Sequence, residues 1–157
     1  MDWLDDGLVK TVHILGATLL FGTGLGTAFQ RWMAHRGGDP VVVASVARTT
    51  VLADWLFTLP AVVLQPITGV LLALSVGFPL TSTWIVVSTG LYLLAGACWI
   101  PVVWLQIRMA KLAEAAARDG AALPPLYHRY ARLWFVLGWP AFAAVLVILH
   151  LMVAKPW

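Results

Sequence analysis

The first apolar run of the chain, Thr11 to Met33, is long enough to cross a membrane as a helix. A spanning helix needs about 20 mostly apolar residues. Three more runs of similar length follow, at about residues 51–74, 84–107 and 133–154. The four runs predict an all-α fold, namely a polytopic membrane protein built as a four-transmembrane-helix bundle, with residues 1–157 forming a single membrane domain.

Composition supports this fold class and argues against a soluble domain. Hydrophobic residues make up 61% of the 157 residues, charged residues make up 11%, and the mean hydropathy is +0.88. A soluble domain is about 45–50% apolar and about 25% charged. The single Cys98 excludes a disulfide within the chain. Nucleic acid is not expected as a partner, because the basic residues lie in segments that flank membrane spans.

Lys and Arg are distributed unevenly between the two sides of the predicted bundle. Three lie in residues 31–50 and five in residues 108–132, against one near each end of the chain. The positive-inside rule therefore predicts a multi-pass membrane protein with both termini on the side away from the cytoplasm. Residues 31–50 are expected to form a polar loop broken by Gly37, Gly38 and Pro40. The Ala-rich segment 108–119 is expected to be helical, and Gly120 with the Pro124–Pro125 pair should end this helix.

Two histidines are predicted at one depth near the outer side of the membrane, His13 in the first run and His150 in the last. An ionisable residue inside a span is a functional-site hypothesis by default. Two imidazoles from different helices at equal height suit a bis-histidine haem b site, with Lys10 and Lys155 placed to meet the haem propionates. The alternatives are that each histidine is hydrogen-bonded to a neighbouring helix, or that the second ligand comes from another copy of the chain.

A second polar layer is expected nearer the cytoplasmic side, around Asp54 in the second run. Gln30 and the Gln106–Arg108 turn lie at a similar predicted depth. Asp54 could belong to a proton path or a substrate pocket, or it could pair with Arg31, Arg48 or Arg108. Pro60 and Pro66 predict a bend in the same run. Gln65 is expected to hydrogen-bond between helices.

A copper site is disfavoured by the predicted depths and faces of the sulfur ligands. Soft sulfur suits Cu(I). Cys98 is expected beyond the membrane midplane from both histidines, and Met152 faces away from His150 on the same helix.

Four segments together resemble the DUF2269 family of small bacterial integral membrane proteins over nearly the whole chain. They are VKTVHILGATLLFGTGLG, DWLFTLPAVVLQPITG, LYLLAGACWIPVVWLQIRMAKLA and GWPAFAAVLVILHLMVAKPW. The resemblance implies kinship with HemJ-type protoporphyrinogen oxidases and CopD-like copper-resistance membrane proteins, which also carry a histidine early in the first span. In the HemJ-type proteins that histidine is associated with haem, and the matching residue here is His13. A lysine early in their third span and their Asn-Glu-x-Pro motif are absent, so the resemblance implies the scaffold and His13 rather than porphyrinogen oxidation.

The sequence therefore favours a haem b-binding membrane protein with an electron-transfer or oxidoreductase role. Its expected partners are the lipid bilayer, a quinone or a redox protein, and further copies of itself in a homo-oligomer. A metal or small-solute transporter or channel subunit that uses Asp54 and Gln65 is the first alternative. The second is an accessory subunit of a larger membrane enzyme, docked through the glycine-rich first helix.

Overall fold

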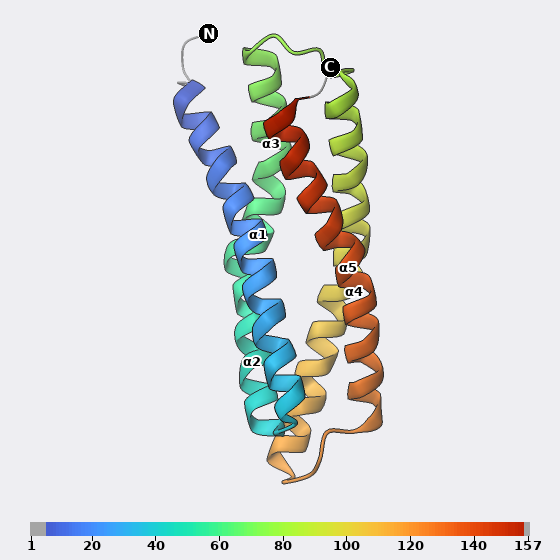
Figure 1. Ribbon diagram of the computed structural model, residues 1–157. Helices are drawn as coiled ribbons and strands as arrows, with labels where there is room; N and C mark the ends of the chain where they lie inside the picture. The colour runs from blue at the N-terminus through green and yellow to red at the C-terminus, as the bar shows by residue number, and fades with distance from the viewer. Residues whose placement is uncertain (1–5, 156–157) are drawn as a thin grey trace.

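The computed structural model of the chain describes residues 6–155, and over this range the regular elements are all helices. In chain order they are α1 (Asp6–Gly37), α2 (Pro40–Ala53), the π-helix η1 (Asp54–Thr58), α3 (Leu59–Ser75), α4 (Thr83–Arg118) and α5 (Pro125–Ala154). Because α2, η1 and α3 are continuous, the helices form four rods side by side (Figure 1). All four rods are long and apolar enough to span a membrane, which confirms the predicted all-α bundle.

The two ends of the bundle differ in character. The basic end carries the α1–α2 turn at Gly38–Asp39 and the α4–α5 connection at residues 119–124 (Figure 1). The terminal end carries the start of α1, the end of α5 and the α3–α4 connection at residues 76–82. At about 1.5 Å per residue, the 36-residue α4 is about 54 Å long. The hydrocarbon core of a bilayer is only about 30 Å thick, so helix ends project beyond it.

The polar loop predicted for residues 31–50 is wrong, since only Gly38 and Asp39 interrupt the helices there. Gly38 adopts a φ of +70° and ends α1. The Asp39 carboxylate then accepts a hydrogen bond from the Val41 N–H at 2.8 Å and caps α2, and Pro40 occupies its first turn. The last helix likewise begins at Pro125 rather than at residue 133. By contrast α4 ends as predicted, just before Gly120, whose φ is +61°.

The closely packed core lies in the half of the bundle nearer the basic end. It joins α1, α2, α4 and α5, and many of its members are alanines, which let helix backbones approach closely. Its buried residues are Ala34, Val43, Ala44, Val102, Leu105, Met109, Ala113, Ala116, Leu123, Tyr127, Ala131 and Trp134.

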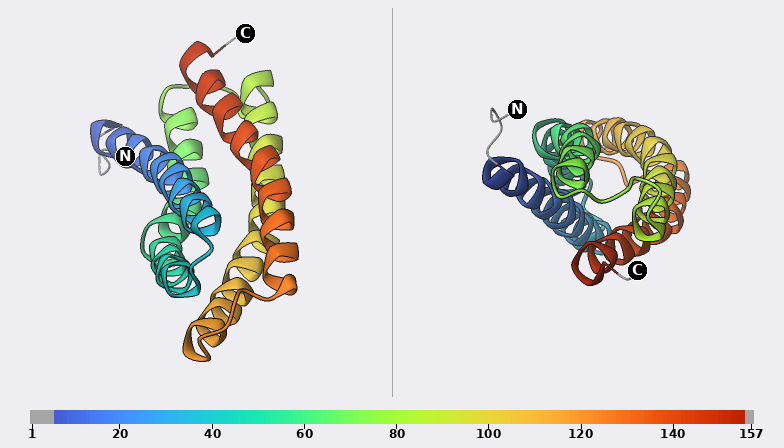
Figure 2. Two further views of the ribbon diagram at one scale, coloured as in Figure 1. Left: turned by 60° about the horizontal axis from the view of Figure 1, so that its bottom comes forward. Right: turned by 90° about the horizontal axis from the view of Figure 1, so that it is seen from above.

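The half nearer the terminal end separates into two helix pairs. There α1 packs on α3 and α4 packs on α5, whereas α3 contacts neither α4 nor α5 closely (Figure 2). One hydrogen bond spans the gap, from the Tyr92 hydroxyl on α4 to the Val62 carbonyl on α3. Val62 lies four residues before Pro66, which has no N–H to donate to that carbonyl. Tyr92 thus satisfies a backbone group that the proline leaves free.

The π-helix η1 lies in the second rod, between α2 and α3. The α2 segment packs on α4, whereas the α3 segment does not. The Leu59 N–H donates to the Asp54 carbonyl, five residues earlier. Pro60 follows in the first turn of α3, where it lacks an N–H and its ring crowds the preceding turn. Single turns of π-helix are frequent at functional sites, and this one begins at Asp54.

The alanine core gives a direct test of the packing. Ala113 on α4 is 0% exposed, so Ala113→Leu should overpack the core and destabilise the protein by about 1–3 kcal/mol. Ala97→Leu, at an exposed position of the same helix, is the matched control and should change stability by less than about 0.5 kcal/mol. The measurement is unfolding of both variants in one detergent. Equal losses would contradict the placement of the core.

Candidate functional site

The histidine predicted in the first span packs against α3. His13 is half-buried, and its Nδ1 lies 2.8 Å from the Thr68 Oγ1. Thr68 is buried, and its hydroxyl donates to the Leu64 carbonyl at 2.7 Å. Gly69 makes the close approach feasible, because a Cβ there would stand 3.2 Å from the His13 Cε1.

The hydrogen bonds around Thr68 lead us to assign one tautomer to His13. Since the Thr68 proton is directed to Leu64, the Thr68 oxygen is left to accept from His13, and the His13 Nδ1 carries the hydrogen. The Nε2 atom then holds the free lone pair. Histidines that ligate metals are oriented in this way, by a hydrogen bond from the other ring nitrogen.

His150 and the two lysines lie near the same end of the bundle. His150 is exposed near the end of α5, and Lys10 is exposed on α1. The Lys155 ammonium lies over the Phe78 ring, 5.3 Å from its centre. The α1 and α5 helices make few contacts.

One of the contacts between α1 and α5 sets their relative height. The Phe21 and Phe142 rings stack with centroids 5.6 Å apart. His13 lies eight residues before Phe21, and His150 lies eight residues after Phe142. Because the two helices run in opposite directions, both histidines are about 12 Å from this contact toward the terminal end.

A buried polar network occupies the other half of the bundle and centres on Asp54 of η1. Its Oδ1 accepts from the Thr58 hydroxyl at 2.9 Å. The Gln106 amide, oriented to satisfy its neighbours, donates from nitrogen to the Asp54 Oδ2 at 2.7 Å and accepts from the Trp134 Nε1 at 3.3 Å. Asp54, Thr58 and Gln106 are each less than 8% exposed. The network links the second rod, α4 and α5.

Arg31 of α1 completes this network without a direct ion pair to any residue that the structure describes. Its side chain is only 6% exposed, and it interacts electrostatically with Asp54. Its guanidinium carbon lies 5.4 Å from the centre of the Trp134 ring. The Nη2 atom reaches the Met109 sulfur at 3.7 Å, whereas the buried Nη1 has no hydrogen-bond partner. A buried cation that lacks acceptors is costly, so Arg31 is the least satisfied group of the network.

A small lateral pocket opens beside the network, between η1 and α4. Its volume is about 210 Å³, and its walls are apolar except for Asp54 and Gln106. The other lining residues are Val51, Trp55, Leu59, Trp99, Ile100 and Val103. A molecule that entered this pocket would contact mostly apolar side chains, together with the Asp54 carboxylate and the Gln106 amide.

The structure distinguishes among the residues predicted near Asp54. Gln106 hydrogen-bonds to Asp54, and Arg31 interacts with it electrostatically but does not form the predicted direct pair among the described contacts. Arg48 instead forms an exposed ion pair with Glu114 at 3.9 Å, and Arg108 lies over the Trp104 ring. Gln30 is exposed on α1.

Gln65 and the sulfur residues add no further site. The Gln65 Oε1 lies against Gly16 of α1 but has no hydrogen-bond partner, so the predicted interhelical bond is wrong for this atom. Within the described residues no group of three or more His, Cys, Asp or Glu side chains could hold a metal ion. Cys98 is a free, half-buried thiol.

A second pair of histidines, which was not predicted from the sequence, lies at the basic end. The rings of His35 on α1 and His128 on α5 lie 5.6 Å apart, and Tyr127 contacts both. The buried His35 Nδ1 has no partner. The available signal was the four-residue spacing of Arg31 and His35, which places them on one face of a helix.

Comparisons with known proteins give a family but no function. Residues 7–156 match the model of the family described as DUF2269, predicted integral membrane protein. No curated protein matches the chain. No solved structure matches it either.

The amide bridge predicts a measurable cost. Gln106→Leu should leave the Asp54 Oδ2 and the Trp134 Nε1 without partners in a buried site, lowering stability by about 1–3 kcal/mol. Gln30→Leu removes the same side-chain type from an exposed position of α1 and should have little effect. Thermal unfolding in detergent compares the two variants. A Gln106 variant as stable as the Gln30 variant would show that the bridge contributes nothing.

Proposed function

The chain belongs to DUF2269, a family of predicted integral membrane proteins, and from this premise we propose that it binds haem b and has an electron-transfer or oxidoreductase role. In this proposal His13 and His150 are the axial ligands of the iron. The haem supplies reversible one-electron chemistry, and the protein supplies the two imidazoles and an apolar surrounding.

The stacking of Phe21 on Phe142 is the observation that carries this proposal. It brings α1 and α5 together at mid-bundle, with each histidine eight residues further toward the terminal end. Equal height on two different helices is what axial ligation from opposite faces of one porphyrin requires.

Three features of the terminal half fit a flat apolar group. The His13 Nε2 is free to ligate, because its Nδ1 is held by Thr68. The helix pairs α1–α3 and α4–α5 do not close on each other there. The Ser88 Oγ on α4 is buried and lacks a partner among the described residues. A bound group with polar edges would give such an atom something to contact.

The surroundings of the site suggest how it would connect to other molecules. Lys10 and Lys155 lie near the terminal end, where they would meet the propionates. We place the protein in the bacterial inner membrane with this end on the periplasmic side, because the basic residues gather at the opposite end. A quinone or a redox protein would exchange electrons with the haem, and a homo-oligomer would cover the exposed apolar helix faces.

A second candidate function rests on Asp54. A carboxylate in the middle of a span, at a π-helix and beside a lateral pocket, is typical of a path for protons or small solutes. The free Oε1 of Gln65 lies further along the same rod.

The haem proposal predicts a coloured protein. The full chain purified in detergent should show a Soret band that shifts on reduction with dithionite, and His13→Ala and His150→Ala should each lower haem content about tenfold or leave a five-coordinate spectrum. Thr68→Val should weaken haem retention about tenfold through the orientation of His13. His35→Ala, at the basic end, is the matched control and should keep the wild-type spectrum. A colourless preparation from haem-replete cells, or a band unaffected by both ligand variants, would refute the proposal.

The second candidate predicts ion movement instead of colour. In proteoliposomes with an imposed potential, wild-type protein should take up protons and Asp54→Asn should reduce the rate at least tenfold. Gln30→Asn is the control for a polar change at an exposed position. Equal rates with and without protein would remove this candidate.

A further inference from the structure

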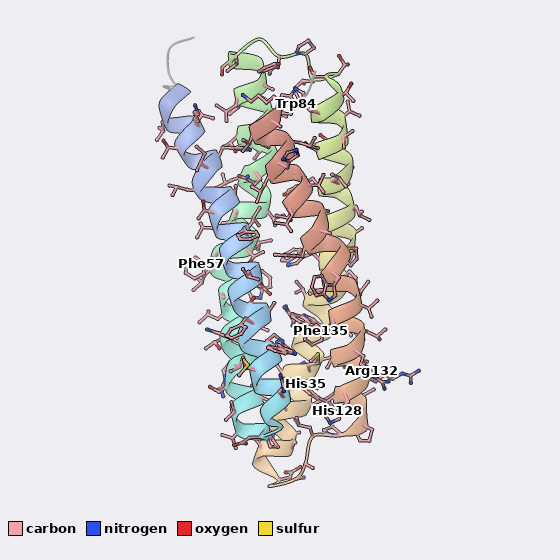
Figure 3. The ribbon with its side chains drawn as sticks, in the orientation of Figure 1. His35, Phe57, Trp84, His128, Arg132 and Phe135 are labelled. Carbon is pink, nitrogen blue, oxygen red and sulfur yellow. The ribbon has the colours of Figure 1, made fainter. Side chains whose placement is uncertain are left out.

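We propose that the basic end holds an oxyanion-binding site between α1 and α5, in which Arg31, His35 and His128 bind a phosphate group. The site lies in the half of the bundle opposite to the proposed haem site and does not depend on it (Figure 3).

Arg31 provides the strongest evidence for a missing ligand. A guanidinium has five N–H donors and no acceptor. In this structure it is 6% exposed, the buried Nη1 is unpartnered, and the one hydrogen-bond acceptor it reaches among the described residues is the thioether of Met109. Asp54 lessens the cost of the charge from a distance, but its two carboxylate oxygens are already engaged by Thr58 and Gln106.

His35 brings a second unpaired nitrogen to the same helix face. It lies four residues after Arg31, one turn further toward the basic end. Its buried Nδ1 lacks a partner, and its ring lies against Tyr127 and His128 of α5. Tyr127 also interacts electrostatically with Arg31, while of the two α1 side chains only His35 contacts its ring directly.

The electrostatic surroundings favour an anion over a cation. His128 lies in the first turn of the 30-residue α5, which carries no acidic residue, and the start of a helix is its positive end. The nearby Asp39 carboxylate is engaged in capping α2. Further cationic side chains surround this end of the bundle, namely Arg36, Arg118, Arg129 and Arg132.

A phosphate group is the oxyanion that suits this position. It accepts several hydrogen bonds and pairs well with a guanidinium. Basic pockets between membrane helices on the positively charged side bind the headgroups of anionic lipids. The same donors would also hold free phosphate arriving from the aqueous side.

Binding to the detergent-purified full chain tests the proposal, measured by native mass spectrometry. The probes are short-chain phosphatidylglycerol, phosphatidylcholine of the same chain length, inorganic phosphate and Zn²⁺. His35→Ala and His128→Ala change partly exposed or exposed residues, so these variants should fold, and Arg31→Gln is added as the strongest change. Arg132→Ala is the matched control, because its side chain extends from α5 away from the bundle, whereas His35 and His128 lie between the helices (Figure 3).

We expect phosphatidylglycerol to bind more tightly than phosphatidylcholine, with affinity reduced about tenfold by each histidine variant and within threefold of wild type for Arg132→Ala. The same loss with inorganic phosphate would support the site and identify free phosphate as the source. The proposal is overturned if neither phosphate probe binds better than phosphatidylcholine, or if Arg132→Ala costs as much as His35→Ala. Zn²⁺ binding that needs both histidines, with no phosphate binding, would also overturn it in favour of a metal site.

Discussion

Close packing of small residues at the basic end is the constraint on which the rest of this structure depends. Inside a membrane, helices gain little by burying apolar side chains, because lipid is equally apolar, so close backbone contact must hold them together. The alanines of the core, such as Ala44, Ala113 and Ala131, provide that contact for α1, α2, α4 and α5. In the described part of the terminal half α1 packs on α3 and α4 packs on α5, but α3 makes no close contact with α4 or α5. The two helix pairs therefore separate there, while the opposite end holds all the rods together.

Prolines in the second rod leave backbone carbonyls without their usual helical N–H donors, so other residues must donate hydrogen bonds to them. Pro66 frees the Val62 carbonyl, and Tyr92 donates to it from α4, which ties the two separated pairs together. Pro60 follows the π-helix, where the hydrogen bonding shifts by one residue and Asp54 turns into the bundle interior. The same deviation that lets α3 leave α4 therefore also delivers a carboxylate to Gln106.

The sequence was sufficient to predict the four spans, because length and hydropathy decide them, and it placed Gln106 near the depth of Asp54, together with Gln30, which is exposed and takes no part in the network. The prediction was wrong for residues 31–50, where single helix-capping residues decide the structure more than the polar composition does. Residues 31–50 have many polar residues, yet Asp39 and Pro40 restart the helix after two residues. The sequence also could not show helix neighbours, which depend on long-range packing, so the contacts of α1 with α5 at mid-bundle and at the basic end came only from the structure.

The polar groups of the bundle differ in charge between its two ends. Near the terminal end the half-buried His13 hydrogen-bonds through its Nδ1 with the Thr68 hydroxyl, which itself donates to the Leu64 carbonyl. Near the basic end the central group is Arg31, which remains positive and offers only donors. Burial makes its charge costly, and Asp54 compensates for it from a distance while bound to other groups. A negatively charged acceptor is the partner that this end lacks.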